Sequence, residues 1–291
     1  RRPVLPVGSS MERNSSQAGK LLLGASYEFE YLQDSYIQDG TQPIANPTYE
    51  RTTSEISALF LNYSITDKLS IETVLPWRKI VNYKIRLDND PELEGPYVRE
   101  TDGFSDAIIL FKYSDYFFDD QILATFSSGL KLATGSVTDL DEDDKVISET
   151  LQVGSGTVDP LFSLFLGYPS GRWLYSGSLF SRISVYENVR GYKYGNEFHG
   201  RISVNYDKSD ALFIKAGLET VLTKRDTHQY GESEDQRGGK WAYAVPGFGI
   251  RFSNNFILDV EYPWTIYYNV NESQLVPDGF LRLNLFYDWS L

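Results

Sequence analysis

Apolar and polar residues alternate with a period of two along much of the chain. The last twelve residues, 280–291, show the pattern: Leu281, Leu283, Leu285, Tyr287, Trp289 and Leu291 alternate with Arg282, Asn284, Asp288 and Ser290. Successive side chains of a β-strand point to opposite faces, so this alternation predicts a strand with one apolar and one polar face. The same alternation predicts strands at roughly 20–32, 173–186, 196–206, 211–223 and 256–267.

Other segments are strand-like without a clear difference between their faces. Residues 53–65, 104–116 and 158–168 are apolar on both faces, so the pattern leaves their orientation open. Residues 69–83, 121–133 and 240–252 complete a series of about twelve predicted strands, an even number of the kind found in bacterial outer-membrane barrels.

Short and long connections alternate between these predicted strands. Short turns are expected at 66–68, 115–120, 169–172, 207–210 and 253–255, and long polar loops near 34–50, 84–103, 134–156, 187–195, 224–239 and 268–279. Short turns at one end of the strands and long loops at the other are typical of outer-membrane β-barrels, in which the short turns face the periplasm. Both chain termini then belong on the periplasmic side.

The predicted fold is all-β: a transmembrane, antiparallel, up-and-down β-barrel of about twelve strands. The barrel domain would cover residues 20–291, preceded by a polar N-terminal periplasmic arm at 1–19. A closed barrel is required in lipid because an unpaired backbone N–H or C=O is costly there. A soluble β-sandwich or lipocalin-like barrel is the alternative, with its apolar face inward. Charges on nearly every strand, without helices to cover the other face, favour the membrane barrel.

If the charged face points inward, the residues lining the lumen can be named. They are Arg78, Lys112, Lys131, Arg182, Glu197, His199, Arg201, Lys215, Glu219, Arg251, Asp259, Glu261 and Arg282. Their charges nearly balance, so they could pair across the lumen and narrow it, or line a thin aqueous path. Aromatic residues near strand ends suit the membrane interface, and this predicts interfacial positions for Trp77, Trp173, Trp241, Trp264 and Trp289.

The composition excludes several classes of site. The chain has 291 residues, no Cys and a formal net charge of −13. Without Cys there are no disulfides, thiolate zinc sites or Cys nucleophiles. The negative charge argues against a nucleic-acid partner, because nucleic-acid binding needs a basic surface.

The negative charge is concentrated in two long loops, 87–102 and 139–149. Carboxylate clusters at an outer surface can bind Ca²⁺ loosely or bridge to lipopolysaccharide through divalent ions. The candidate ligands for such a weak cation site are Asp139, Asp141, Asp143 and Asp144. Their spacing lacks the central Gly and distal Glu of an EF-hand, so a solvated acidic loop is the favoured interpretation. No other cofactor is predicted.

Nothing in the sequence indicates an enzyme. An outer-membrane phospholipase would need a Ser/His pair, and the chain has two His. His199 lies between Glu197 and Arg201 on the predicted lumen face, where a hydrogen-bonded interior residue is the simpler interpretation. Ser178, Ser184 and Ser203 could neighbour His199, but nothing in the sequence brings one of them within its reach.

Several segments resemble a known family of outer-membrane barrel proteins. They include "ITDKLSIETVLPW" (65–77), "GFSDAIILFKY" (103–113), "GLKLATG" (129–135), "VGSGTVDPLFSL" (153–164) and "GGKWAYAVPGFGIRFSNNFILDVEYPW" (238–264). In order and spacing they are similar to the family named for the MetA pathway of phenol degradation, whose members are transporter-like. The resemblance implies transport of small, apolar or aromatic compounds across the outer membrane.

The predicted function is therefore a porin-like channel or transporter for small solutes in the outer membrane of a Gram-negative bacterium, surrounded by lipid and lipopolysaccharide. One alternative is a structural or docking barrel that holds another envelope protein through the N-terminal arm or the acidic loops. A second alternative is an outer-membrane lipid-modifying enzyme.

Overall fold

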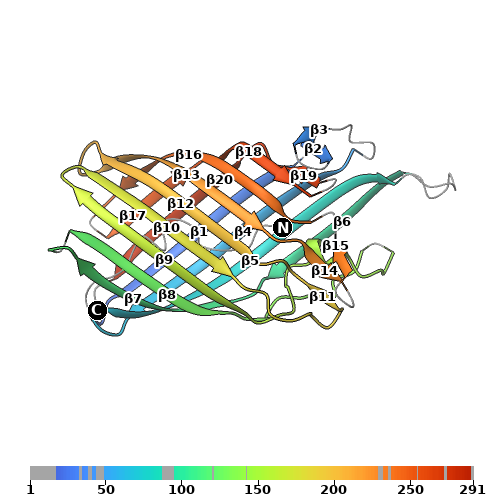
Figure 1. Cartoon of the computed structure of the whole chain (residues 1–291), viewed down its shortest axis with the longest axis horizontal. Helices are drawn as coiled ribbons and strands as arrows, with labels where there is room; N and C mark the ends of the chain where they lie inside the picture. Colours follow the sequence, from blue (N-terminus) through green and yellow to red (C-terminus); the bar gives the residue numbers. More distant parts are fainter. Residues whose placement is uncertain are drawn as a thin grey trace.

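The strands of the computed structural model close into one antiparallel barrel of twelve strands (Figure 1). The structure describes residues 18–32, 35–38, 41–43, 49–86, 95–119, 121–141, 143–228, 232–234, 237–253, 255–271 and 274–289. The predicted periplasmic arm, 1–19, lies outside these residues except for its last two. Among the described residues, no helix is long and apolar enough to cross a membrane.

Each predicted strand corresponds to an observed one. The barrel strands are β1 (Leu21–Leu32), β4 (Arg51–Ser64), β5 (Leu69–Arg86), β7 (Ile108–Phe117), β8 (Ile122–Lys131), β9 (Asp159–Ser170), β10 (Trp173–Arg182), β12 (Glu197–Asp207), β13 (Leu212–Thr223), β16 (Gly239–Arg251), β17 (Phe256–Glu261) and β20 (Phe280–Trp289). The strand predicted at 256–267 is interrupted: β17 ends before Pro263, and β18 (Trp264–Val270) continues alongside β16. Pro has no N–H to donate to a sheet, which explains the interruption there.

The first and last strands close the barrel. β1 pairs with β20 from Leu21 opposite Trp289 to Glu30 opposite Phe280. This confirms that the amphipathic segment at the end of the chain is a wall strand. The pairing removes the last free sheet edge, which would otherwise leave backbone groups unpaired in lipid.

Long and short connections lie at opposite ends of the barrel. The short turns are on the left in Figure 1, and the additional elements gather on the right, at the long-connection end. These elements are β2 (Ser35–Gln38), β3 (Gln42–Pro43) and β19 (Gln274–Val276) in one small sheet, β11 (Tyr192–Lys193), β14 (Asp226–His228) and β15 (Glu232–Glu234) in another, β6 (Gly95–Phe104), and the 3-10 turn η1 (Glu149–Leu151). The start of β1 and the end of β20 lie together at the short-turn end.

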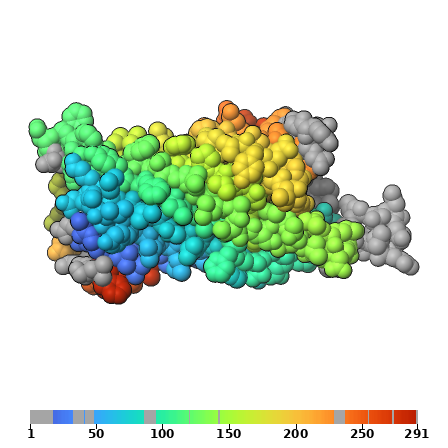
Figure 2. Space-filling model, turned by 90° about the horizontal axis from the view of Figure 1, so that it is seen from below, coloured from blue at the N-terminus to red at the C-terminus, as the bar shows by residue number. Residues whose placement is uncertain are grey.

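The outer wall of the barrel is apolar. Figure 2 shows this wall from another side, with the colours of neighbouring strands following one another across it. Large apolar side chains exposed on it by 38% to 62% include Leu59, Phe111, Leu164, Leu179, Ile202 and Leu218. An apolar belt around a closed barrel is the surface that lipid requires and that a soluble protein avoids. The fold is therefore that of a membrane-spanning β-barrel.

The strands with two apolar faces owe that pattern to an apolar patch inside the barrel. Ile56, Phe60, Ile108, Leu110 and Leu161 point inward and are exposed by 8% or less. Their outward neighbours are apolar as well because they face the surrounding lipid. The sequence pattern was ambiguous there because both environments are apolar.

One interfacial tryptophan was predicted wrongly. Trp77, Trp173, Trp264 and Trp289 are exposed on the outer wall by 41% to 60%. Trp241 instead lies opposite the buried Val221 and packs against an interior cluster. Position near a strand end does not determine which face a side chain occupies; the register of β16 against β13 turns Trp241 inward.

Candidate functional site in the barrel lumen

The predicted lumen residues line the interior of the barrel, with one exception. Arg78, Lys112, Lys131, Arg182, Glu197, His199, Arg201, Lys215, Glu219, Asp259, Glu261 and Arg282 are exposed by only 1% to 7%. Arg251 is the exception: its side chain, at the short-turn end, is 31% exposed and forms an ion pair of 2.7 Å with Asp207. Buried charges are costly unless they are paired, so their partners define the interior.

The largest group of ion pairs crosses the lumen around Glu261 on β17. Arg201, which projects from β12 beyond two intervening strands, contacts Glu261 at 2.6 and 3.0 Å. Arg282 on β20 reaches Glu261 at 3.1 Å and also Glu219 on β13 at 3.1 Å. Lys215 adds a third cation, 2.6 Å from Glu261. One carboxylate thus joins three cationic side chains from three strands.

The edges of this group are also paired. Lys215 Nζ lies 2.7 Å from Asp259, and Arg282 Nε lies 3.2 Å from Glu28 on β1. Every contact is formed by a side chain of the inner face. The barrel wall from β12 round to β1 therefore carries a group of mutually paired charges, next to a buried apolar cluster of Val221, Tyr243, Val245 and Phe280.

A second group of ion pairs lies nearer the long-connection end. Arg182 bridges Asp159 at 2.8 Å and Glu197 at 2.6 Å. Lys131 contacts Asp159 at 3.0 Å and Asp106 at 3.1 Å. Asp106 also accepts hydrogen bonds from backbone N–H groups of the loop after β8. This group connects the barrel wall to that loop.

The opposite wall, from β4 to β10, is different in character. Phe60, Val74, Ile108, Leu110 and Leu161 form a buried apolar cluster with Ala58 and Phe180. Buried ion pairs flank this cluster: Lys112 to Glu72 at 2.7 Å, and, toward the long-connection end of the same wall, the second group of ion pairs around Asp159. The lumen thus has one side with the main charged group and one side with a large apolar cluster, an arrangement suited to a molecule with both kinds of surface.

The long loop between β8 and β9 folds into the mouth of the barrel. Ile147, Gln152 and Val153 in its second half are buried, with exposures of 0% to 2%. Thr101 and Ser105 each donate a side-chain hydrogen bond of 2.5 Å to a carbonyl of this loop, those of Leu151 and Val153. The inward loop, residues 132–158, therefore narrows the opening.

Close backbone packing holds the base of the inward loop together. A side chain at Gly154 would bring its Cβ within 2.2 Å of the backbone of Gly135, so only glycine fits. Arg190 donates to the carbonyls of Val137 at 3.2 Å and Ile147 at 3.0 Å from a neighbouring connection. The segment "VGSGTVDP" (153–160), which leads into β9, therefore also forms the close contact with Gly135.

The acidic loop at 139–149, for which a solvated loop was the favoured interpretation, is exposed at 143–146 but buries Ile147. Asp143 and Asp144 are exposed, as expected. The signal that was missed is the presence of apolar residues within and just after the acidic segment, such as Ile147 and Val153. They require burial, and the mouth of the barrel provides it.

The aspartates of this loop do not converge on a cation site. Among the described residues, no group of three or more His, Asp or Glu side chains is arranged to hold a metal ion. Asp141 accepts hydrogen bonds from the backbone N–H groups of Asp143 and Lys145, both at 2.9 Å, and from the Tyr97 hydroxyl. The Tyr97 hydrogen bond holds the pKa of Asp141 below its usual value. Of the proposed ligands Asp139, Asp141, Asp143 and Asp144, Asp141 therefore organises a turn, while Asp143 and Asp144 are exposed.

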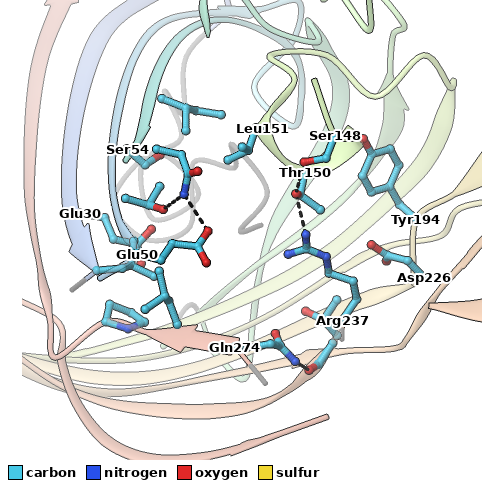
Figure 3. Close-up of a pocket in the computed structure, with 18 of the residues that line it drawn as sticks. Glu30, Glu50, Ser54, Ser148, Thr150, Leu151, Tyr194, Asp226, Arg237 and Gln274 are labelled. Atoms are coloured by element: carbon cyan, nitrogen blue, oxygen red, sulfur yellow. Dashed lines mark hydrogen bonds between the residues drawn. The ribbon is translucent and has the colours of Figure 1, made fainter. Parts of the chain in front are cut away.

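A pocket of about 360 Å³ occupies the mouth of the lumen (Figure 3). Glu30, Glu50, Ser54, Thr150, Tyr194, Asp226, Arg237 and Gln274 lie around it, drawn from the barrel wall, the inward loop and the connections near it. Leu32, Val221, Trp241, Leu275 and Pro277 give part of its lining an apolar character. The pocket can therefore offer both charged groups and an apolar surface to a small molecule.

Polar contacts hold the rim of this pocket in shape. Arg237 donates to the hydroxyl of Thr150 at 2.7 Å, which joins the inward loop to the connection before β16. The hydroxyl of Tyr192 donates to Asp226 at 2.5 Å, and Asp226 also accepts from the N–H of Gly195 at 2.6 Å. Burial, together with the charge of Asp226, raises the pKa of Tyr192 well above its usual value. Tyr192 therefore stays a neutral donor.

His199 is buried on the inner face of β12. Neither imidazole nitrogen has a hydrogen-bond partner in the described part of the chain, and Nε2 lies 3.9 Å from Glu197. The ring packs edge-on against Phe180, with 5.9 Å between ring centres. The prediction of a buried lumen residue is met, whereas the expected hydrogen bond is not found.

Geometry and surface together define the class: a membrane-spanning β-barrel whose lumen is packed with charged pairs and narrowed by an inward loop. The COG4313 outer-membrane channel from Pseudomonas putida F1 has a similar structure, with a TM-score of 0.70, 12% identity, and coverage of 94% of this chain and 96% of that one. Two further structures are more distant. A FadL homologue from Pseudomonas aeruginosa has a TM-score of 0.48 and 12% identity, with coverage of 94% of this chain and 91% of that one. The toluene transporter TodX from Pseudomonas putida has a TM-score of 0.43 and 9% identity, with coverage of 93% of this chain and 88% of that one.

Comparisons of sequence add no family name. No family model matches the chain, and no curated protein matches it. The resemblance to the family of the MetA pathway of phenol degradation is therefore not confirmed, while the outer-membrane type of barrel is.

Proposed function

We propose that this protein is an outer-membrane channel for small solutes that carry both an apolar or aromatic part and a polar group. The observation that carries the proposal is the mouth pocket, which opens onto a lumen with the main charged group on one wall and a large apolar cluster on the other. A solute with both kinds of surface could enter the pocket and pass between these walls. The long loops would face the outside and the two termini the periplasm.

Two further observations support a channel. Twelve strands enclose a space between that of a filled eight-stranded barrel and that of a wide porin. The similarly folded protein of Pseudomonas putida F1 is described as an outer-membrane channel. The paired charges and the inward loop would keep the passage narrow, so small solutes are the expected class.

Planar-bilayer recording of the purified chain tests the proposal. Thr101→Val combined with Ser105→Ala removes two hydrogen bonds that hold the inward loop, without changing any charge. We expect small currents from the unmodified protein and longer or larger openings from this double variant. Ser57→Ala, on the exposed outer face of β4, is the control and is expected to conduct like the unmodified protein.

Solute passage is tested separately in proteoliposomes. Uptake of a small aromatic acid should exceed that of a sugar of similar size, because only the aromatic acid suits both walls. If neither the unmodified protein nor the double variant conducts, and no solute enters, the protein is not a channel. A current without preference for the aromatic acid would retain the channel and refute the proposed solute class.

A further inference from the structure

A hollow lined by basic residues lies on the rim of the barrel at the long-connection end. Its volume is about 420 Å³, and it is formed where β13, β16 and β18 end. The lining residues are Thr223, Lys224, Arg225, Gly239, Lys240, Asn269 and Asn271. It is separate from the mouth pocket described above, since the two share only Thr223 among their lining residues.

Strand register shows that the hollow opens on the outer wall. Lys240 pairs with Leu222 on β13 and with Asn269 on β18, so the three side chains share one face. Leu222 is 44% exposed on the apolar belt, and Leu218, four residues nearer the short-turn end, is 47% exposed. Lys240 therefore stands at the border of the apolar outer surface, at the long-connection end.

Among the described residues, the lining provides hydrogen-bond donors and positive charge without a carboxylate. Lys224, Arg225 and Lys240 are exposed, and Asn269 and Asn271 add side-chain amides. In the part of the chain that the structure describes, neither Lys224 nor Lys240 has an ion pair with a carboxylate. Other exposed cations do: Lys79 pairs with Glu100 at 2.8 Å, and Lys68 with Asp115 at 2.7 Å. Such a concentration of cations is notable in a chain whose net charge is −13.

We propose that this hollow binds a phosphate group of lipopolysaccharide, the phosphorylated lipid of the outer leaflet. Lys and Arg side chains form charge-assisted hydrogen bonds with phosphate, and basic residues close to a membrane surface are attracted to anionic headgroups. The level of Lys240, directly above the apolar belt, matches the depth at which such a phosphate would lie. The inference rests on the outer-membrane location proposed above and not on conduction through the lumen. It also differs from the expected bridge through acidic loops, because it needs no divalent ion.

Binding of lipopolysaccharide to the purified full-length chain in a neutral maltoside detergent tests the proposal. The titrants are lipopolysaccharide, the same lipid with its phosphates removed, and inorganic phosphate. We expect the phosphorylated lipid to bind about tenfold more tightly than the dephosphorylated one. Lys224→Gln combined with Lys240→Gln should remove this difference. Lys208→Gln, an exposed lysine in the short turn at the opposite end, is the matched control and should retain it.

Three outcomes would overturn the proposal. The double variant could bind lipopolysaccharide as tightly as the unmodified chain, or phosphate removal could leave the affinity unchanged. Inorganic phosphate could also displace the lipid at equal concentration, which would identify a free-anion site. A folded-state check on both variants, by their shift in gel mobility on heating, excludes loss of the barrel as the cause. Because the assay does not measure current, its result is independent of whether the barrel is a channel.

Discussion

At the scale of single residues, Glu261 is the lumen carboxylate that joins three cationic side chains. It accepts contacts from Arg201, Lys215 and Arg282, and it is almost completely buried. Glu261→Gln would leave three buried cations with one fewer compensating charge. We expect a loss of about 3 to 5 kcal/mol in the free energy of unfolding, measured by urea denaturation in lipid vesicles.

Glu187→Gln serves as the control for this substitution. It removes the same negative charge from an exposed position in a connection. Its free energy of unfolding should stay within about 0.5 kcal/mol of that of the unmodified protein. Equal stability of the two variants would mean that the lumen network does not depend on Glu261.

The hydrogen bond between Tyr97 and Asp141 makes a second prediction at this scale. A pKa lowered in the folded state means that the ionised carboxylate stabilises the turn above its unfolded pKa. This contribution disappears only as the pH falls through the lower folded pKa. Tyr97→Phe should therefore raise the pKa of Asp141 toward its usual value, as followed by carbon NMR of the carboxyl group. The exposed Tyr168→Phe should leave this pKa unchanged, and a similar shift in both variants would argue against the assigned cause.

The sequence predicted the residue types of the lumen but not their partners. Alternation along each strand is sufficient to turn Arg201 and Glu261 to one face. Their contact depends on two residues 60 positions apart in the sequence lying on strands separated by two others in the barrel wall, which no local pattern contains. The same limit explains Trp241, whose face was set by its register against Val221.

At the scale of elements, close packing between strands makes another prediction. A Cβ at Gly129 on β8 would lie 1.9 Å from the carbonyl oxygen of Ile109 on β7. Gly129→Val should therefore disrupt the pairing of these strands and prevent assembly of the folded barrel. The measurement is the fraction of chain that shows the heat-dependent gel shift after refolding.

Gly177 on β10 provides the matched control, because the nearest atom to a Cβ there is 3.8 Å away. Gly177→Ala should fold in the same yield as the unmodified chain. Efficient folding of Gly129→Val would show that β7 and β8 can separate more than this packing allows.

Strands were easier to predict than connections for a physical reason. A wall strand faces lipid on one side and the lumen on the other. On most strands, this difference appears as an alternation of apolar and polar residues with a period of two. The inward loop has no such periodicity: its apolar residues are scattered among carboxylates and are buried by contacts with Thr101, Ser105 and Arg190. Likewise, the sequence pattern predicted one continuous strand at 256–267, although this segment contains Pro263, where the observed strand is interrupted.

At the scale of the whole molecule, the division of the lumen follows the order of strands around the barrel. The strands from β4 to β10 contribute the apolar wall, and those from β12 round to β1 contribute the main charged group. Within each of these two groups, strands that are adjacent in the barrel also follow one another along the chain, except where β20 pairs with β1. That junction therefore completes both the hydrogen-bonded wall and the charged half, through Arg282 and Glu28.

The closing junction can be tested with a disulfide, since the chain has no Cys of its own. Ala25 lies directly opposite Leu285 in the pairing of β1 with β20. Opposed residues in antiparallel strands have Cα atoms about 4.5 to 5.5 Å apart, within the range that a disulfide spans. Ala25→Cys with Leu285→Cys should therefore form an internal disulfide on mild oxidation and migrate faster on a denaturing gel.

A mismatched pair of Cys residues shows whether crosslinking depends on the strand register or only on the two strands being close to each other. Ala25→Cys with Trp289→Cys uses a β20 residue four positions away, about 13 Å further along the strand. A closed barrel with the observed register should crosslink the first pair and not the second, because a rigid ladder prevents the strands from sliding. Crosslinking of both pairs would indicate a junction that slips, and crosslinking of neither would mean that β1 and β20 do not close the barrel in the membrane.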